Sequence, residues 1–133
     1  MELNKPFCDS VKTDTTQSDL AGSANMIKNM CHGVAVECGW WEDEKKRNVP
    51  TLLMLCVSEL AEAMEGDRKS LMDDHLPHRE MLEVELADAI IRIFDMAGGL
   101  NLDIGGAIAE KLKYNTERND HRLDVRENGG KSY

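Results

Sequence analysis

Two pairs of acidic residues stand at matching spacing in the middle of the chain. Glu59 and Glu62 are three residues apart, and so are Glu85 and Asp88. On a helix, residues three apart project from one face, so each pair presents two carboxylates side by side. Carboxylates that are buried together repel one another and need a compensating cation. Four of them on two facing helices suit a hard cation such as Mg²⁺, which prefers oxygen ligands.

The first acidic pair continues an apolar stripe. Leu52, Leu55, Glu59 and Glu62 follow one another at spacings of three or four residues. This pattern indicates that the acids face the interior of the protein, where a metal ion would be needed. A solvated acidic face is the alternative, and it stays open because the chain has 25 acidic residues.

A local group of basic and amide side chains follows near the C-terminus, although the net charge of the chain is −9. Lys111, Asn115 and Arg118 lie within about two helical turns. Lysine offers a point charge, arginine a bidentate fork and asparagine an amide donor, all of which bind phosphate oxygens. The alternative is ordinary helix design, because cations favour the C-terminal end of a helix. Taken together, the acids and the bases predict a phosphate ester or anhydride as the ligand.

The elements that must position these residues are helices, because apolar residues recur at helical spacing and strand-like alternation is rare. The fold class is therefore expected to be all-α. The predicted helices cover residues 18–39, 50–64, 79–97 and 101–117. The third of them is expected to bury a stripe made of Leu82, Leu86, Ile90, Ile93 and Ala97. Asn101 or Asp103 can cap the start of the fourth.

The 133 residues suffice for one domain with a core and are too few for two of ordinary size. Residues 18–122 are expected to form it, between an N-terminal arm at residues 1–17 and a C-terminal tail at residues 123–133. Gly66 is expected to lie just past the end of the second helix, and Gly98 and Gly99 to end the third.

Composition excludes several function classes. The pI near 4.9 argues against nucleic-acid binding, which needs a basic surface. A long apolar run and the features of a signal peptide are both missing, so we expect a soluble, cytoplasmic protein that does not contact membranes. No C-x-x-C pair occurs, so reduced packing cysteines are expected. The four cysteines are Cys8, Cys31, Cys38 and Cys56.

Three motifs carry a family resemblance. They are Glu59-Leu60-Ala61-Glu62, Glu85-Leu86-Ala87-Asp88 and Lys111-x-x-x-Asn115-x-x-Arg118, in that order. In these motifs the sequence resembles the MazG-like all-α nucleoside triphosphate pyrophosphohydrolases, over about residues 25–122. The resemblance implies a four-to-five-helix bundle that assembles as a homo-dimer or homo-tetramer.

The resemblance also implies a reaction and a set of roles. Glu59, Glu62, Glu85 and Asp88 would be the catalytic acids and would hold Mg²⁺, for which Mn²⁺ can substitute. The substrate would be a (deoxy)nucleoside triphosphate, cleaved between the α and β phosphates into the monophosphate and pyrophosphate. Phosphate binding would fall to the third motif, namely Lys111, Asn115 and Arg118.

Related dCTP pyrophosphatases carry a histidine and, nine residues later, a tryptophan that line the base pocket. His32 and Trp41 stand at the same separation here, and Trp40 is adjacent. Aromatic rings can stack on a base, so all three residues are candidate base contacts. The alternatives are a tryptophan packed at a subunit interface and an exposed helical histidine.

Two positions depart from the family pattern. Ser58 stands where the relatives often have a second glutamate, so which acid activates the water stays open. Arg92 replaces a tyrosine of the dCTP pyrophosphatases, and it is a further candidate phosphate contact.

The same acidic residues suggest two rival functions. A ferritin-like di-iron bundle also gathers carboxylates, but it needs Glu-x-x-His pairs, and neither Glu59 nor Glu85 has a histidine three residues on. A non-enzymatic helical interaction or regulatory module, whose acidic faces would be solvated, stays open as the alternative function.

Overall fold

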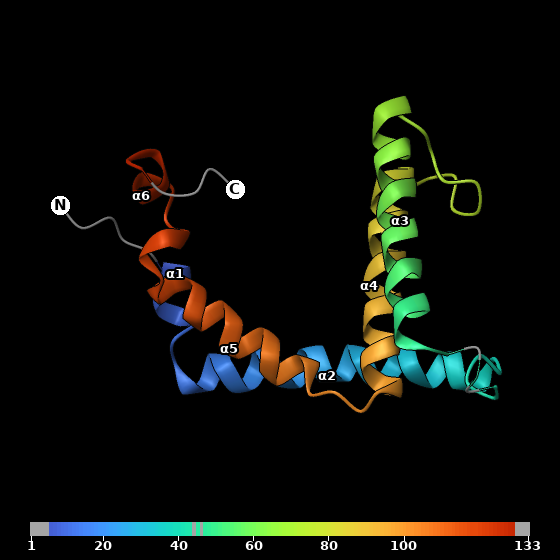
Figure 1. Cartoon of the computed structure of the whole chain (residues 1–133), viewed down its shortest axis with the longest axis horizontal. Helices are drawn as coiled ribbons and strands as arrows, with labels where there is room; N and C mark the ends of the chain where they lie inside the picture. The colour runs from blue at the N-terminus through green and yellow to red at the C-terminus, as the bar shows by residue number, and fades with distance from the viewer. Residues whose placement is uncertain (1–5, 44, 46, 130–133) are drawn as a thin grey trace. The chain divides into compact units, whose positions relative to one another are not determined.

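The computed structural model describes residues 6–43, 45 and 47–129 of the chain. Over these residues the protein consists of six α-helices and one 3-10 helix and has no strand, which confirms the all-α prediction (Figure 1). The elements are α1 (Pro6–Ser10), α2 (Asp14–Glu37), α3 (Val49–Lys69), α4 (Met81–Gly99), α5 (Ile104–Glu117), the 3-10 helix η2 (Asn119–His121) and α6 (Leu123–Glu127).

The chain divides into two compact units. The first contains the residues up to Asn25 and those from Asp103 onward, and the second is Met26–Leu102. The first half of α2 therefore belongs to one unit and its second half to the other. The predicted acids and the predicted base contacts lie in the second unit, whereas Lys111, Asn115 and Arg118 lie in the first.

In the first unit, α5 packs against the first half of α2. A Cβ atom at Gly105 would lie 2.2 Å from the carbonyl oxygen of Ala21, so only glycine allows this approach. Asn25 fixes the contact, because its Oδ1 accepts from the Gly105 N–H at 3.0 Å and its Nδ2 donates to Asp103 Oδ1 at 2.8 Å. Asp103 also caps α5, as predicted, by accepting from the N–H of Gly106.

In the second unit, α3 and α4 pair as a helical hairpin. Asn48 starts α3 by accepting a hydrogen bond from the Thr51 N–H at 3.0 Å, and Pro50 stands in the first turn, where its missing N–H costs nothing. The interface between the two helices is made of mostly small side chains, which let the backbones approach. The buried residues are Leu52, Cys56, Glu59, Ala63 and Gly66 of α3 and Ala89, Phe94 and Ala97 of α4.

The end of α4 receives the second half of α2 and the turn after it. A Cβ atom at Gly98 would lie 2.4 Å from His32 Cβ, and one at Gly99 would lie 2.0 Å from an atom of the Trp41 ring. Both glycines are the last residues of α4, so they do end this helix as predicted. Their lack of a side chain also makes room for two of the predicted base contacts.

Several predicted helix boundaries were wrong. Gly66 lies inside α3, where a Cβ atom would come within 2.9 Å of the Met81 side chain, and the helix runs on to Lys69. Ser70 ends it with a φ of 51°. The arm and the tail contain the short helices α1 and α6, which were not predicted; residues 1–5 and 130–133 lie outside the described residues.

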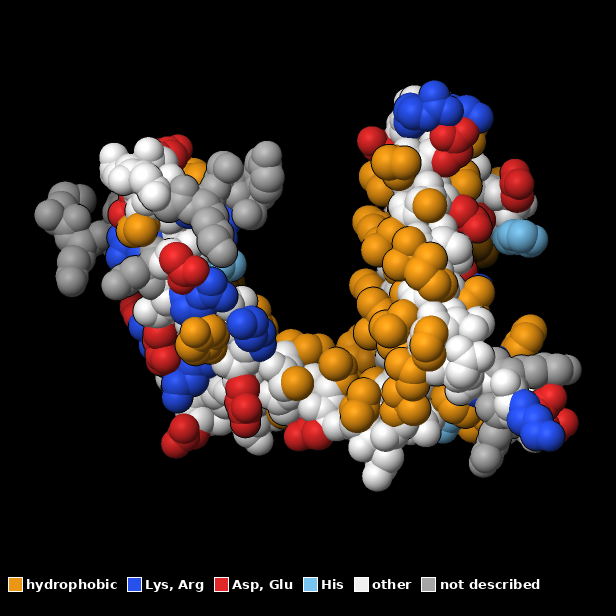
Figure 2. All heavy atoms as spheres, in the orientation of Figure 1, with side chains coloured by type: hydrophobic (Ala, Val, Ile, Leu, Met, Phe, Trp, Pro, Cys, Tyr) orange, Lys and Arg blue, Asp and Glu red, His pale blue; other side chains and the backbone are white. Residues whose placement is uncertain are grey.

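The predicted core stripe of α4 was also largely wrong. Leu86, Ile90 and Ile93 are 43%, 50% and 38% exposed, although Ala97 is buried as expected. The reason is that α4 carries apolar residues around most of its circumference, and the ones that are buried are Ala89, Phe94 and Ala97. Figure 2 shows hydrophobic side chains along the outside of the hairpin. On α3 the exposed ones include Leu53, Val57, Leu60 and Met64.

None of the described helices is both long and apolar enough to cross a membrane. The four cysteines are free thiols. Cys56 is buried in the α3–α4 interface, as expected of a packing cysteine, whereas Cys8 and Cys31 are half-buried and Cys38 is exposed.

Candidate active site

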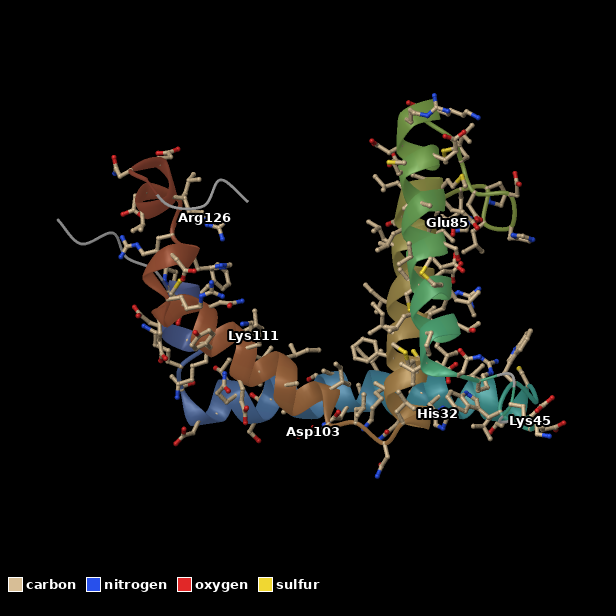
Figure 3. All side chains as sticks on the ribbon, in the orientation of Figure 1. His32, Lys45, Glu85, Asp103, Lys111 and Arg126 are labelled. Atoms are coloured by element: carbon tan, nitrogen blue, oxygen red, sulfur yellow. The ribbon has the colours of Figure 1, made fainter. Side chains whose placement is uncertain are left out.

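The α3–α4 hairpin brings three of the four predicted acids together. Glu59, Glu85 and Asp88 each offer a carboxylate oxygen, and these oxygens lie within 4.8 Å of one another. Glu59 is only 6% exposed, and the other two are half-buried. Figure 3 labels Glu85 on the hairpin. We call these three residues the acid cluster.

The fourth predicted acid, Glu62, lies outside the cluster and is exposed. It is nevertheless close enough for its charge to help raise the pKa of Glu85. Ser58, at the position of the family's second glutamate, is exposed and donates its hydroxyl to the carbonyl of Leu55 at 2.7 Å. Glu62 therefore lies at the edge of the cluster, and Ser58 does not supply the second glutamate that the family often has at this position.

Crowding of the carboxylates disfavours their charged forms. Burial, the adjoining carboxyl of Glu59 and the charge of Glu62 raise the pKa of Glu85 from its ordinary value of 4.5 to about 7. Burial and the charge of Glu59 also raise the pKa of Asp88. A cluster whose members resist ionisation in this way is a site that a bound cation would stabilise.

Arg92 supplies one positive charge to the cluster. It stands one turn after Asp88 on α4 and donates its Nε–H to Oε1 of Glu59 on α3. Its side chain is 42% exposed, so it reaches from the surface to a buried acid. The sequence predicted a phosphate contact at Arg92 and did not predict this ion pair.

A further acid near the cluster was missed. Asp73, in the connection between α3 and α4, is only 6% exposed, and its charge helps to raise the pKa of Asp88. Its Oδ2 accepts from the backbone N–H groups of His75 at 3.2 Å and Leu76 at 3.4 Å, as an aspartate does at the start of a turn. The only signal in the sequence was an aspartate in a polar loop, which does not distinguish this residue from its neighbours.

The acid cluster fits a small divalent cation by its chemistry. Three carboxylates are the ligand type that Mg²⁺ and Mn²⁺ accept. Ligand oxygens at about 2.1 Å from Mg²⁺ lie at most about 4.2 Å apart, so the side chains would draw the three oxygens, which lie within 4.8 Å of one another, closer together around the ion.

Two predicted base contacts are held by an aspartate that the sequence did not single out. Asp95 Oδ1 lies 2.9 Å from His32 Nδ1 and accepts from Trp41 Nε1 at 2.8 Å. The two rings meet edge to face, with centroids 5.1 Å apart. This arrangement attaches α2 and the turn that carries Trp41 to α4. A packing role was the alternative for Trp41, although that alternative placed the tryptophan at a subunit interface and this contact lies within one chain.

A cavity of about 840 Å³ adjoins the cluster in the second unit. Asp88 and Arg92 line it, together with Trp40, Arg47 and Asp95. Trp40 is 65% exposed, and the guanidinium carbon of Arg47 lies 5.3 Å from its ring centroid. The structure therefore joins one predicted base contact, two arginines and one member of the acid cluster around a single hollow. Arg47 was missed, because it stood in a charged stretch with no evident pattern.

The predicted phosphate contacts of the first unit gather around Tyr114. Lys111 Nζ lies 4.7 Å from the Tyr114 ring centroid, and the Arg118 guanidinium carbon lies 5.6 Å from it. Arg118 also binds both carboxylate oxygens of Asp120, which lowers the pKa of Asp120 to about 2. Asn115 Oδ1 is buried without a hydrogen-bond partner among the described residues.

The chain matches no protein-family model, no curated protein and no solved structure. The resemblance to the MazG-like enzymes therefore rests on its three motifs, and membership of that family stays a prediction.

The raised pKa of Glu85 predicts a particular pH dependence of stability in the absence of divalent cations. Between about pH 4.5 and pH 7 the folded protein holds a proton that the unfolded chain has released, so its stability falls as the pH rises through this window. Glu85→Gln removes the titrating group. We expect it to raise the free energy of unfolding at pH 8 by about 1 kcal/mol, a value reduced for solvent screening, and to change it little at pH 4.5.

The measurement is thermal unfolding in EDTA at both pH values. Glu83→Gln is the matched control, because Glu83 is an exposed acid of the same helix that pairs with Arg79. Equal effects of Glu85→Gln at pH 4.5 and pH 8 would contradict the assignment.

Proposed function

We propose that this protein is a Mg²⁺-dependent nucleoside triphosphate pyrophosphohydrolase of the MazG-like type. It would hydrolyse (deoxy)nucleoside triphosphates between the α and β phosphates, giving the monophosphate and pyrophosphate. The observation that supports this most is the convergence of Glu59, Glu85 and Asp88, from two helices, beside a cavity that Asp88 also lines.

Three of the acids share one task in this proposal. Glu59, Glu85 and Asp88 would hold Mg²⁺, or Mn²⁺ in its place, and Glu62 stands at the exposed edge of the cluster. When bound, the cation would offset the charge of the polyphosphate and lower the pKa of an attacking water. The carboxylates of the cluster keep the water oriented and accept its proton. Rigid helices suit this task, because phosphoryl chemistry depends mainly on positioning and electrostatics.

The cavity is of a suitable size and chemistry for a nucleotide. Its volume of about 840 Å³ lies within the range of small-molecule sites, roughly 300–1,000 Å³. Trp40 offers an exposed ring for stacking on the base, and Arg47 and Arg92 offer positive charge to phosphates. His32 and Trp41 support this wall through Asp95. Lys111, Asn115 and Arg118 of the first unit do not line this cavity, and their role as phosphate contacts rests on the resemblance alone.

A homo-oligomer is part of the proposal. Leu53, Val57, Leu60 and Met64 recur at three- or four-residue spacing on α3 and are 49–67% exposed. Such a seam is typical of helices that pack against further helices. A second copy of the chain would cover it and complete a bundle of at least four helices, in a dimer or a tetramer. The protein would act in the cytoplasm, where its four free thiols stay reduced.

The alternative function is a non-enzymatic helical interaction or regulatory module. The observation that favours it is the same exposed apolar seam, because such a surface also suits a different protein partner. The two functions differ in what happens to a nucleoside triphosphate.

The first test incubates the protein and Mg²⁺ with a panel of ordinary and modified (deoxy)nucleoside triphosphates and scores monophosphate and pyrophosphate. We expect at least one member to yield both products in equal amounts. Asp88→Asn should reduce the rate by at least about 100-fold, because it removes a carboxylate from the cation site.

Asp74→Asn is the matched control, since Asp74 is an exposed aspartate outside the cluster, and we expect it to retain activity. Absence of pyrophosphate for every substrate would leave the interaction module as the better proposal. Full activity of Asp88→Asn would refute the assignment of the site.

The second test concerns the base contact. We expect Trp40→Ala to raise KM on the order of tenfold and to change kcat little, because base stacking contributes to binding and not to the chemical step. Phe7→Ala removes another exposed aromatic ring, one that does not line the cavity, and should leave KM unchanged. An unaltered KM in Trp40→Ala across the panel would exclude stacking on this ring.

The third test concerns assembly. Sedimentation at micromolar concentration should give the mass of a dimer or tetramer for the wild type. Leu60→Glu should shift the protein toward the monomer, because it places a charge in the apolar seam. Thr51→Glu, on the opposite side of α3, should not. A monomeric wild type would disprove the proposed assembly.

A further inference from the structure

Arg92 has a contact that its predicted role does not explain. A phosphate contact would face the cavity, and Arg92 does line it. Yet its Nε–H is bound to Glu59, which is the most buried acid of the cluster and lies 33 residues earlier on the other helix of the hairpin. Arg92 therefore both pairs with the acid cluster and lines the cavity, as Asp88 of the cluster also does.

The carboxylate of Glu59 has two uses that compete with each other. Oε1 of Glu59 accepts from Arg92, and Glu59 is also one of the three residues whose oxygens converge as cation ligands. A divalent cation at these oxygens would lie within a few ångströms of the guanidinium, where two positive charges repel strongly. Because the Arg92 side chain is 42% exposed, it has room to move toward solvent and the cavity.

We propose that Arg92 is a built-in competitor of the divalent cation at Glu59. In the metal-free protein it offsets part of the charge of the acid cluster. It leaves Glu59 when the cation binds, and its guanidinium then turns into the cavity toward the phosphates of the substrate. This second half rests on the proposed function, whereas the competition itself concerns only the cation and the protein.

The competition has a measurable size. If Arg92 occupies Glu59 for about nine-tenths of the time, the apparent affinity for the cation is lowered about tenfold. Removing the guanidinium should therefore raise the apparent affinity for the cation about tenfold. It should also lower the stability of the metal-free protein, because Glu59 would then be buried without its counter-charge.

The experiment titrates Mn²⁺ into the full chain without nucleotide, by calorimetry, and follows thermal unfolding in EDTA and in Mn²⁺. We expect Arg92→Gln to bind Mn²⁺ about tenfold more tightly than the wild type, to unfold at a lower temperature in EDTA, and to gain more from added Mn²⁺. Arg92→Lys keeps the charge and should stay near the wild-type affinity.

Arg79→Gln is the control for net charge, because Arg79 pairs with the exposed Glu83 and does not touch the cluster. Its Mn²⁺ affinity should match that of the wild type. Equal or weaker Mn²⁺ binding by Arg92→Gln would overturn the proposal, and so would absence of Mn²⁺ binding by wild type and variant alike. If Arg92→Gln gains affinity but no triphosphate is hydrolysed, the competition stands and the proposed pyrophosphohydrolase activity falls.

Discussion

The close packing of α3 against α4 is the constraint on which the candidate site depends. Small residues, among them Ala63, Ala89 and Ala97, fill the interface and let the two helices approach. The approach brings Glu59 within reach of Glu85 and Asp88, which stand on the other helix. The same packing that stabilises the hairpin therefore forces like charges together, and the protein must offset that repulsion with protons, with Arg92 or with a bound cation.

Two residues of the second unit reduce this repulsion. Glu85 meets it by holding its proton up to about pH 7, and Arg92 meets it by pairing with Glu59. A bound divalent cation would offset the same negative charge and would replace both the proton on Glu85 and the ion pair of Arg92. The cavity next to the cluster is lined by the exposed Trp40 and by two arginines, Arg47 and Arg92. Its lining therefore suits an anionic ligand that carries a flat ring. These features favour the proposed nucleotide pyrophosphohydrolase over the alternative, an interaction module.

The use of small residues inside the hairpin has a second consequence, because it leaves large apolar side chains outside. Leu60, Ile90 and Ile93 are all more than a third exposed. Full burial of a wholly exposed Leu or Ile side chain contributes roughly 1.5–3 kcal/mol, so a second copy that covered these partly exposed side chains would gain a fraction of that for each. The acid cluster and the apolar seam thus have one origin, namely an interface in which most of the buried side chains are small.

The sequence by itself determined the features that depend on local spacing. The helical class, the acid pairs on single helix faces and a cap at either Asn101 or Asp103 follow from periodicity and from neighbours within four residues. Tertiary structure decided which face of α4 is buried, the exposure of Glu62, and the partners of Arg92. Those outcomes depend on contacts between different helices, such as the one between Arg92 and Glu59, which are 33 positions apart. An apolar pattern that runs around a helix does not say which side its neighbour will cover.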